Sequence, residues 1–253
     1  MLFFLMEILK NVEIVDLCLY LKKEKVLILA DTHIGYEESL NKQGVLIPRF
    51  QFKDIIERLE KVFEKVGNVD KIIINGDIKH EFGTISEQEW RHTLRLIDFL
   101  SKYCNEIILI RGNHDTILGP IAKKRNIKVE DYIKFRDILV IHGHKIPSKY
   151  VLKGIKTIII GHEHPAVTLK EESRVETYKC FLKGKFIVPN TSSKARRKDK
   201  TLIVQPSLNL VAEGTDILKE ELLSPFLKQD LGNFECFVVG DKVYGFGKLK
   251  KLV

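Results

Sequence analysis

The chain contains the stretch Ile107-Ile108-Leu109-Ile110-Arg111-Gly112-Asn113-His114-Asp115, in which an apolar run ends at side chains that bind metals or transfer protons. Four other apolar runs end in the same way, namely 26–30 before Asp31 and His33, 71–75 before Asp77, 138–141 before His142, and 157–160 before His162 and His164. Short runs rich in Ile, Val and Leu predict buried strands. Functional groups in open α/β sheets gather beyond the carboxyl ends of the strands, so five such endings predict one site.

Composition limits the class of protein. The chain has 253 residues and 44% hydrophobic residues, enough for a normal core, and no linker divides it. We expect a single domain over 1–253, with 1–11 as an N-terminal extension. The four cysteines form no CxxC pair, which argues against a zinc knuckle or a disulfide framework and favours a reducing, cytoplasmic setting. No run approaches the roughly 20 apolar residues of a membrane span, so we expect no membrane protein.

The net charge of +8 favours polyanionic partners such as nucleic acid. A surface generally rich in Lys and Glu is the alternative explanation. The densest basic cluster, 194–200, contains Arg196 and Arg197 and lies in a loop that begins at Pro189. It is the candidate contact for a phosphate backbone, although a solvated turn is the commoner role of such a cluster.

Periodicity predicts an α/β fold with two sheets packed face to face and helices outside. Helical spacing of apolar residues predicts helices over 51–66 and 86–103, the second opened by a capping box of Ser86 and Glu89. Because these helices alternate with strands, we expect a parallel sheet with crossover helices. The remaining expectations are an opening hairpin of 12–21 with 26–30, a hairpin of 180–182 with 186–188, a strand over 201–205, a helix over 216–223, and a closing hairpin of 236–239 with 243–246.

The polar groups at the strand ends suit a pair of metal ions. Asp31 and His33 stand two residues apart, so both can point the same way from an extended segment. Asp77 follows a glycine and can bridge two ions through its two oxygens. The other candidate ligands are Asn113, His142, His162 and His164. Mixed nitrogen and oxygen donors suit Mn²⁺, Fe, Zn²⁺ or Ni²⁺ better than Mg²⁺ or Ca²⁺. Two ions about 3.5 to 4 Å apart activate water and neutralise a phosphoryl transition state, which predicts phosphoester hydrolysis.

These motifs, taken in order, resemble the signature of the calcineurin-like metallophosphoesterase superfamily. The matching segments are Asp31-x-His33, Gly76-Asp77, Gly112-Asn113-His114-Asp115, His142 and Gly161-His162-x-His164. The resemblance implies a four-layer α/β/β/α sandwich with a binuclear metal centre between its sheets. By position, one metal would be held by Asp31, His33, Asp77 and His164, and the other by Asp77, Asn113, His142 and His162. His114 would protonate the leaving oxygen, with Asp115 orienting it.

Two segments, Ala30–Glu37 and Gly76–Gly83, are similar to an archaeal group related to the SbcD-type repair nucleases. That resemblance implies hydrolysis of phosphodiesters or terminal phosphates in DNA or RNA, with a helicase or another repair protein as partner. The chain is much shorter than those nucleases, and 205–253 resembles the smaller group's own C-terminal segment, packing on the core. The alternatives are an enzyme for small nucleotides or phosphoproteins, and a non-catalytic scaffold of the same fold.

Candidate substrate contacts surround these motifs. His80, three residues after Asp77, is either a contact to substrate or a surface residue. Tyr36 and Arg49 are candidates for shaping the substrate pocket. His144 either lines the cleft or bonds a neighbouring strand, and His142 is preferred as the ligand because it directly follows the apolar run.

Overall fold

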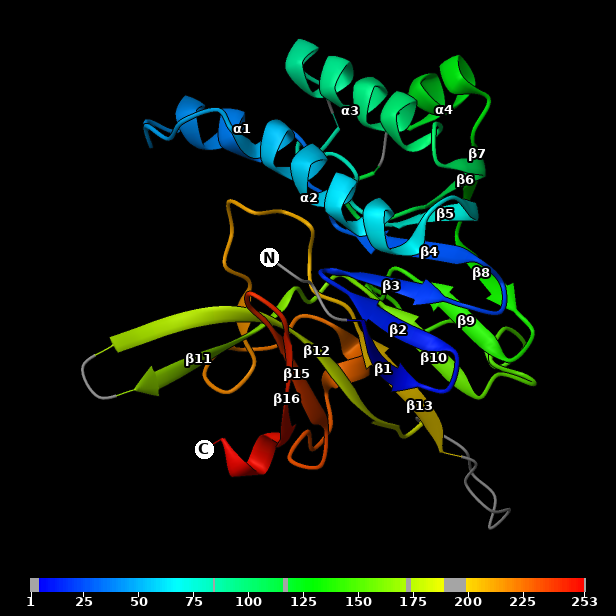
Figure 1. Cartoon of the computed structure of the whole chain (residues 1–253), viewed down its shortest axis with the longest axis vertical. Helices are drawn as coiled ribbons and strands as arrows, with labels where there is room; N and C mark the ends of the chain where they lie inside the picture. Colours follow the sequence, from blue (N-terminus) through cyan, green and yellow to red (C-terminus); the bar gives the residue numbers. More distant parts are fainter. Residues whose placement is uncertain (1–4, 84, 116–117, 172–173, 189–198, 253) are drawn as a thin grey trace.

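The apolar runs form two mixed β-sheets in the computed structural model of the chain, which describes residues 5–83, 85–115, 118–171, 174–188 and 199–252 (Figure 1). The first sheet has the order β1-β2-β3-β4-β5-β6-β7, antiparallel from β1 to β4 and parallel from β4 to β7. Its strands are β1 (Met6–Leu9), β2 (Val12–Val15), β3 (Cys18–Leu21), β4 (Val26–Ala30), β5 (Val69–Asn75), β6 (Cys104–Ile110) and β7 (Lys128–Glu130).

The second sheet has the order β14-β11-β12-β13-β10-β9-β8, and a hairpin of β15 and β16 is attached to β12. Within it β9, β10 and β13 run parallel, while β11, β12 and β15 are paired antiparallel. Its strands are β8 (Tyr132–Phe135), β9 (Ile138–Ile141), β10 (Thr157–Ile160), β11 (Pro165–Glu171), β12 (Arg174–Phe186), β13 (Lys200–Val204), β14 (Thr215–Asp216), β15 (Glu235–Val239) and β16 (Val243–Lys248).

The described residues form four α-helices, namely α1 (Tyr36–Lys42), α2 (Gln51–Val66), α3 (Glu87–Leu100) and α4 (Gly119–Arg125). Helices α2, α3 and α4 lie over the outer face of the first sheet (Figure 1) and bury their apolar residues in the core formed with it. Ser86 caps α3 by accepting a hydrogen bond from the backbone N–H of Glu89, whose side chain accepts from that of Ser86 in return. Because α2 joins β4 to β5 and α3 joins β5 to β6, the predicted parallel sheet with crossover helices is confirmed.

Alternation along β10 shows how the second sheet is covered. Ile159 belongs to the core shared with the first sheet, whereas Ile158 and Ile160 face the opposite side. That side packs against Phe226 in the 3₁₀ helix η1 (Pro225–Leu227) and Leu249 in η2 (Leu249–Lys251). The C-terminal segment therefore covers the outer face of the second sheet. None of the helices in the described ranges is long and apolar enough to cross a membrane.

Two N-terminal predictions need correction. Residues 12–21 form two strands rather than one, because the chain turns at Asp16, which has a φ of 57°. The expected extension contributes β1 from Met6 onward, where Ile8 is buried in the core, so residues 6–9 belong to the first sheet.

Two later predictions are also wrong. Gly184 does not turn the chain but lies within β12, where a β-carbon would overlap the ring of Phe234; close packing explains this glycine. Residues 216–223 are not helical. The carboxylate of Asp216 accepts a hydrogen bond from the backbone N–H of Leu218, which forms a turn. Glu163 accepts one from the backbone N–H of Leu223, so this N–H is not available to a helix.

Candidate metal centre

The predicted ligands meet where the two sheets present the carboxyl ends of their strands. Asp31 and His33 follow β4, Asp77 follows β5, and His142 and His162 follow β9 and β10. Asn113 follows β6, and His164 ends the loop after β10. Four of these side chains are withdrawn from solvent: Asp31 and His142 are fully buried, His33 is 4% exposed and Asp77 is 2% exposed. The remaining three, Asn113, His162 and His164, are half-buried. Strands β4 to β6 are parallel neighbours, as are β9 and β10, so register alone aligns these ends within each sheet.

Three groups of side chains in the described ranges have ligand atoms within 4.8 Å of one another, namely Asp31, His33 and His164, then Asp77, His142 and His162, and also His33, His80 and His114. The first two groups consist of predicted metal ligands only. In the first, His33 Nε2 lies 3.3 Å from His164 Nε2, and His164 Nε2 lies 3.6 Å from an oxygen of Asp31. In the second, His142 Nε2 lies 3.4 Å from Asp77 Oδ2. This grouping divides the residues as the family resemblance divides them.

Two contacts complete the double cluster. Asp77 Oδ2 also lies 3.8 Å from His33 Nε2, so one carboxylate oxygen faces both groups. Asn113 Oδ1 lies 3.0 Å from His142 Nε2, which places the amide in the second group.

The backbone at these positions is held in a rarely populated conformation. Five of the seven predicted ligands have a left-handed backbone, with φ of 51° at Asp31, 43° at His33, 40° at Asp77, 66° at His162 and 52° at His164. A non-glycine residue there costs on the order of 1–3 kcal/mol, and such residues gather at functional sites. The left-handed turns direct the side chains of these five predicted ligands toward the same cluster.

Glycines permit the close approach of the second group. A β-carbon on Gly76, whose φ is 83°, would overlap the ring of His142, and one on Gly112 would overlap the carboxylate of Asp77. Both glycines stand directly beside a predicted ligand in sequence, as the glycine before Asp77 suggested.

Burial and the neighbouring ligands shift the pKa values of the predicted metal ligands. Burial disfavours the charged ring of His142, but the carboxylates of Asp31 and Asp77 outweigh it and raise its pKa to about 9. Burial, with the neighbouring His164, lowers the pKa of His33 to about 3, and burial with His142 lowers that of His162 to about 4. Burial opposes ionisation of Asp31, yet the nearby His142 and His164 hold its pKa below the ordinary value.

These residues fit a pair of divalent cations. Two imidazole nitrogens facing each other at 3.3 Å, as in His33 and His164, direct lone pairs at one another unless a proton or cation lies between them. Within the described ranges, the buried Oδ1 of Asp31 accepts no hydrogen bond, although His142 Nδ1 lies 3.3 Å away, and an unsatisfied buried oxygen is costly. Carboxylate, amide and imidazole donors gathered in one cluster are the ligands that such cations take.

His114 lies beside the first group, with its ring centroid 4.9 Å from that of His33. Its Nδ1 lies 2.6 Å from the carbonyl oxygen of His80, which orients the ring. Asp115 was expected to do this. Its two carboxylate oxygens instead accept hydrogen bonds from the backbone N–H of Ile78 and Gly112, and burial followed by the charge of Asp77 raises its pKa to about 7. Asp115 thus fixes the loop that carries His114, and it acts on the ring only through that loop.

The predicted substrate contacts fall in different places. The ring of Tyr36 meets that of His80 edge-on at 4.6 Å, and His80 in turn lies beside His114, so these two border the cluster. Arg49 donates to the side chain of Gln88 at the surface. His144 lies 5.3 Å from His142 by ring centroid. Arg196 and Arg197 lie outside the described residues.

Sequence patterns did not assign a role to several residues that hold the site together. Gln51, at the start of α2, donates to the carbonyl oxygens of Thr32 and His33 and is buried. Lys79 is fully buried, and its amino group donates to the carbonyl oxygens of Glu81 and His114. The one sequence signal for Lys79 is its position between Asp77 and His80, two candidate site residues. A lysine at that position is expected to lie beside the site and not in solvent.

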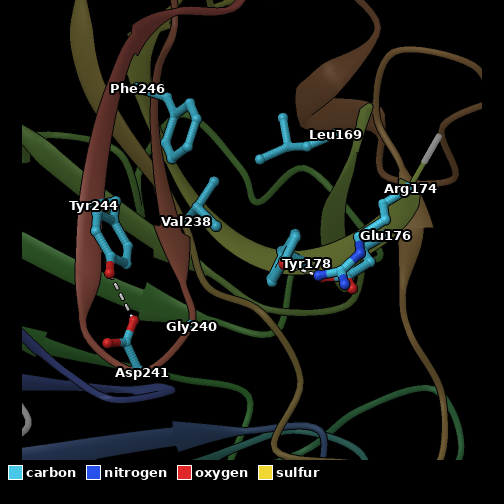
Figure 2. Close-up of a pocket in the computed structure, with 9 residues that line it drawn as sticks. All are labelled: Leu169, Arg174, Glu176, Tyr178, Val238, Gly240, Asp241, Tyr244 and Phe246. Carbon is cyan, nitrogen blue, oxygen red and sulfur yellow. Dashed lines mark hydrogen bonds between the residues drawn. The ribbon is translucent and has the colours of Figure 1, made fainter. Parts of the chain in front are cut away.

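A separate pocket of about 440 Å³ lies between the β11–β12 and β15–β16 hairpins and contains none of the predicted site residues (Figure 2). Its rings are anchored by carboxylates: the hydroxyl of Tyr244 donates to Asp241 at 2.7 Å, and that of Tyr178 donates to Glu176. The pocket therefore belongs to the hairpins and not to the strand-end cluster.

Comparison with known proteins gives one family match. The family model for calcineurin-like phosphoesterases matches residues 24–204. No curated protein matches the chain. A protein of unknown function from Aquifex aeolicus is 20% identical, with 58% of this chain and 81% of that one covered and a TM-score of 0.37.

Two further solved structures are each 14% identical to this chain. One is a double mutant of Vps29 from Entamoeba histolytica, with 85% of this chain and 86% of that one covered and a TM-score of 0.32. The other is an uncharacterised protein described as a predicted phosphoesterase from Streptococcus pneumoniae, with 88% and 97% covered and a TM-score of 0.31.

Proposed function

This chain belongs to the calcineurin-like phosphoesterase family, and we propose that it hydrolyses phosphodiester bonds in DNA or RNA with two divalent metal ions. The observation that carries the proposal is the convergence of seven donor side chains from both sheets on two adjoining groups, with His114 beside them. The two mixed sheets agree with the sandwich fold of the metallophosphoesterases. Phosphomonoesters are a further class of substrate for the same centre.

We assign the ligands by group. Asp31, His33, Asp77 and His164 hold one ion, and Asp77, Asn113, His142 and His162 hold the other. When bound, such a pair supplies an activated water and offsets the charge of the phosphoryl transition state. Mn²⁺ is the ion we favour for this mixture of nitrogen and oxygen donors, with Fe, Zn²⁺ and Ni²⁺ as alternatives.

The protein's own groups move the remaining proton. His114 donates it to the oxygen of the leaving group, because a protonated imidazole can act as a general acid toward an alkoxide. The carbonyl oxygen of His80 receives the Nδ1–H of His114 and so leaves Nε2 to face the substrate. Asp115 keeps the loop in place through the backbone of Ile78 and Gly112.

The preference for nucleic acid is supported by the net charge of +8 and by the resemblance of Ala30–Glu37 and Gly76–Gly83 to the SbcD-related group. We propose Arg196 and Arg197 as contacts to the phosphate backbone, with Arg49, Tyr36 and His80 as contacts nearer the cluster. A helicase or another repair protein is the partner that this assignment implies.

The test is hydrolysis of bis-p-nitrophenyl phosphate, p-nitrophenyl phosphate and labelled DNA and RNA strands, with Mn²⁺ or with EDTA. We expect the diester and a nucleic acid to be cleaved only with metal. Asp77→Ala should abolish cleavage, whereas Asp70→Ala, an exposed aspartate at the other end of β5, should not. Cleavage of the monoester alone would identify a phosphatase for small substrates. Inactivity on all substrates with metal bound would indicate a scaffold.

A further inference from the structure

Phe82 is a large apolar side chain placed at the candidate general acid with no role in the core. Its ring centroid lies 3.7 Å from that of His114, with the ring planes inclined by 33°. The residue is nevertheless 58% exposed, and among the described residues it belongs to neither core cluster. Burial of apolar area does not explain its position, because much of the ring remains in water.

Buried charges fix the segment that carries this ring. The amino group of Lys79 donates to the carbonyl oxygen of Glu81, the residue before Phe82, and to that of His114 at 3.1 Å. The carboxylate of Glu89, fully buried in α3, accepts the backbone N–H of His80 at 3.1 Å and that of Glu81 at 2.8 Å. Charge-assisted hydrogen bonds of this kind are about twice as strong as neutral ones. The loop of Phe82 is thereby tied to the loop of His114.

The ring of Phe82 lies where the leaving group is expected to extend. If His114 protonates the leaving oxygen, the rest of the leaving group extends past the imidazole and meets what lies next to it. We propose that Phe82 is a stacking platform for the base of the leaving nucleoside, so that the substrate is a phosphodiester with a base on that side. This inference rests on the proposed function and specifies its substrate.

A base fits the platform better than an alkyl chain does. The exposed ring presents a flat π-face, and stacking of a base on an aromatic side chain contributes about 1–3 kcal/mol without regard to base identity. Edge-on contact of Tyr36 with His80, and of His80 with His33, continues a row of rings along the same border of the site.

Three dinucleotides test the proposal: thymidylyl-thymidine and two analogues in which a tetrahydrofuran residue replaces one or the other nucleoside. The position of the phosphate in the products identifies the leaving side. For the wild type, we expect removal of the base on the leaving side to lower kcat/KM about tenfold, and removal on the other side to have little effect. Phe82→Leu should abolish the difference between base and no base on the leaving side, and Phe82→Trp should retain it.

The control variant is Phe246→Leu, a half-exposed phenylalanine of the β15–β16 hairpin, which should keep the wild-type preference. Equal effects of Phe82→Leu on all three dinucleotides, or no effect, would overturn the stacking platform. Hydrolysis of bis-p-nitrophenyl phosphate distinguishes failure of this inference from failure of the proposed function. If metal-dependent cleavage of that diester is present but Phe82→Leu is not selective, or the dinucleotides are not cleaved, only the inference fails. If that cleavage is absent, the proposed function fails and the inference with it.

Discussion

Strand β5 and the turn that follows it bury their side chains to the same extent, but the buried residues have different roles. Ile72, Ile73 and Ile74 are at most 1% exposed and are apolar, with extended backbone. Three residues later Asp77 is 2% exposed, charged and left-handed. The interior of the strand stabilises the fold, whereas the charged groups held close together at its end lower the stability. Substitutions at the two places should therefore separate function from stability.

The largest expected effect is on catalysis. His114→Gln should lower kcat on a dinucleotide by about 10²–10⁴-fold, the usual contribution of a general acid, with little change in the free energy of unfolding. The loss should be much smaller for bis-p-nitrophenyl phosphate, because p-nitrophenolate leaves without needing a proton. Steady-state kinetics on both substrates measure this, and His92→Gln on α3 is the control. An equal loss on both substrates would argue against proton donation.

Within the strand the expectation is reversed. Ile73→Ala should lower the free energy of unfolding by about 2–5 kcal/mol, because it removes buried methyl groups and leaves a cavity in the core against the face of the sheet. The activity of each folded molecule should stay close to wild type. Denaturant unfolding and titration of active sites give the two quantities, and Ile73→Val should cost only about 0.5–1.5 kcal/mol. Loss of activity without loss of stability would contradict the division of roles.

The same division explains what the sequence could predict. Apolar runs such as 107–110 and helical spacing in 51–66 depend on local patterns, so strands, crossover helices and the polar groups at the strand ends can be read directly. The ligand clusters form because parallel strands bring their ends together, which the order of elements already implies.

Other features depend on partners distant in sequence. Gly184 has the local sequence of a turn residue, but the ring of Phe234 packed against it is what requires a glycine there. The left-handed turns at Asp31 and His162, and the role of Lys79 between Glu81 and His114, require the tertiary structure, because no local pattern marks them. The contact between Asp115 and His114 was wrongly expected for the same reason, since the backbone of Ile78 arrives from a different strand end.

Metal removal should have a smaller effect that is again confined to the strand ends. Mn²⁺ at about 100 times its Kd should raise the free energy of unfolding by about 2.7 kcal/mol for each ion bound, because the donors are clustered only in the folded chain. EDTA should reverse the gain, as measured by thermal unfolding at fixed protein concentration. His162→Asn should reduce the gain without lowering the stability of the metal-free protein, since Asn tolerates a φ of 66°. A metal effect equal in wild type and variant would place the ion elsewhere.

The smallest expected effect concerns a charge within a strand rather than at its end. Lys179 lies in β12, where burial and then the charge of Arg58 lower its pKa to about 8, and its amino group contacts Ser207 Oγ at 2.8 Å. Between about pH 8 and its ordinary pKa of 10.5, the unfolded chain binds a proton that the folded chain does not, so stability should rise with pH across that window. One pKa unit corresponds to about 1.4 kcal/mol, and the partial exposure of Lys179 limits the rise to about that size. Lys179→Met should remove this rise from the unfolding free energy measured against pH, whereas Lys170→Met, an exposed lysine of β11, should retain it. An unchanged pH profile in Lys179→Met would show that this lysine is solvated in the folded chain and keeps its ordinary pKa there.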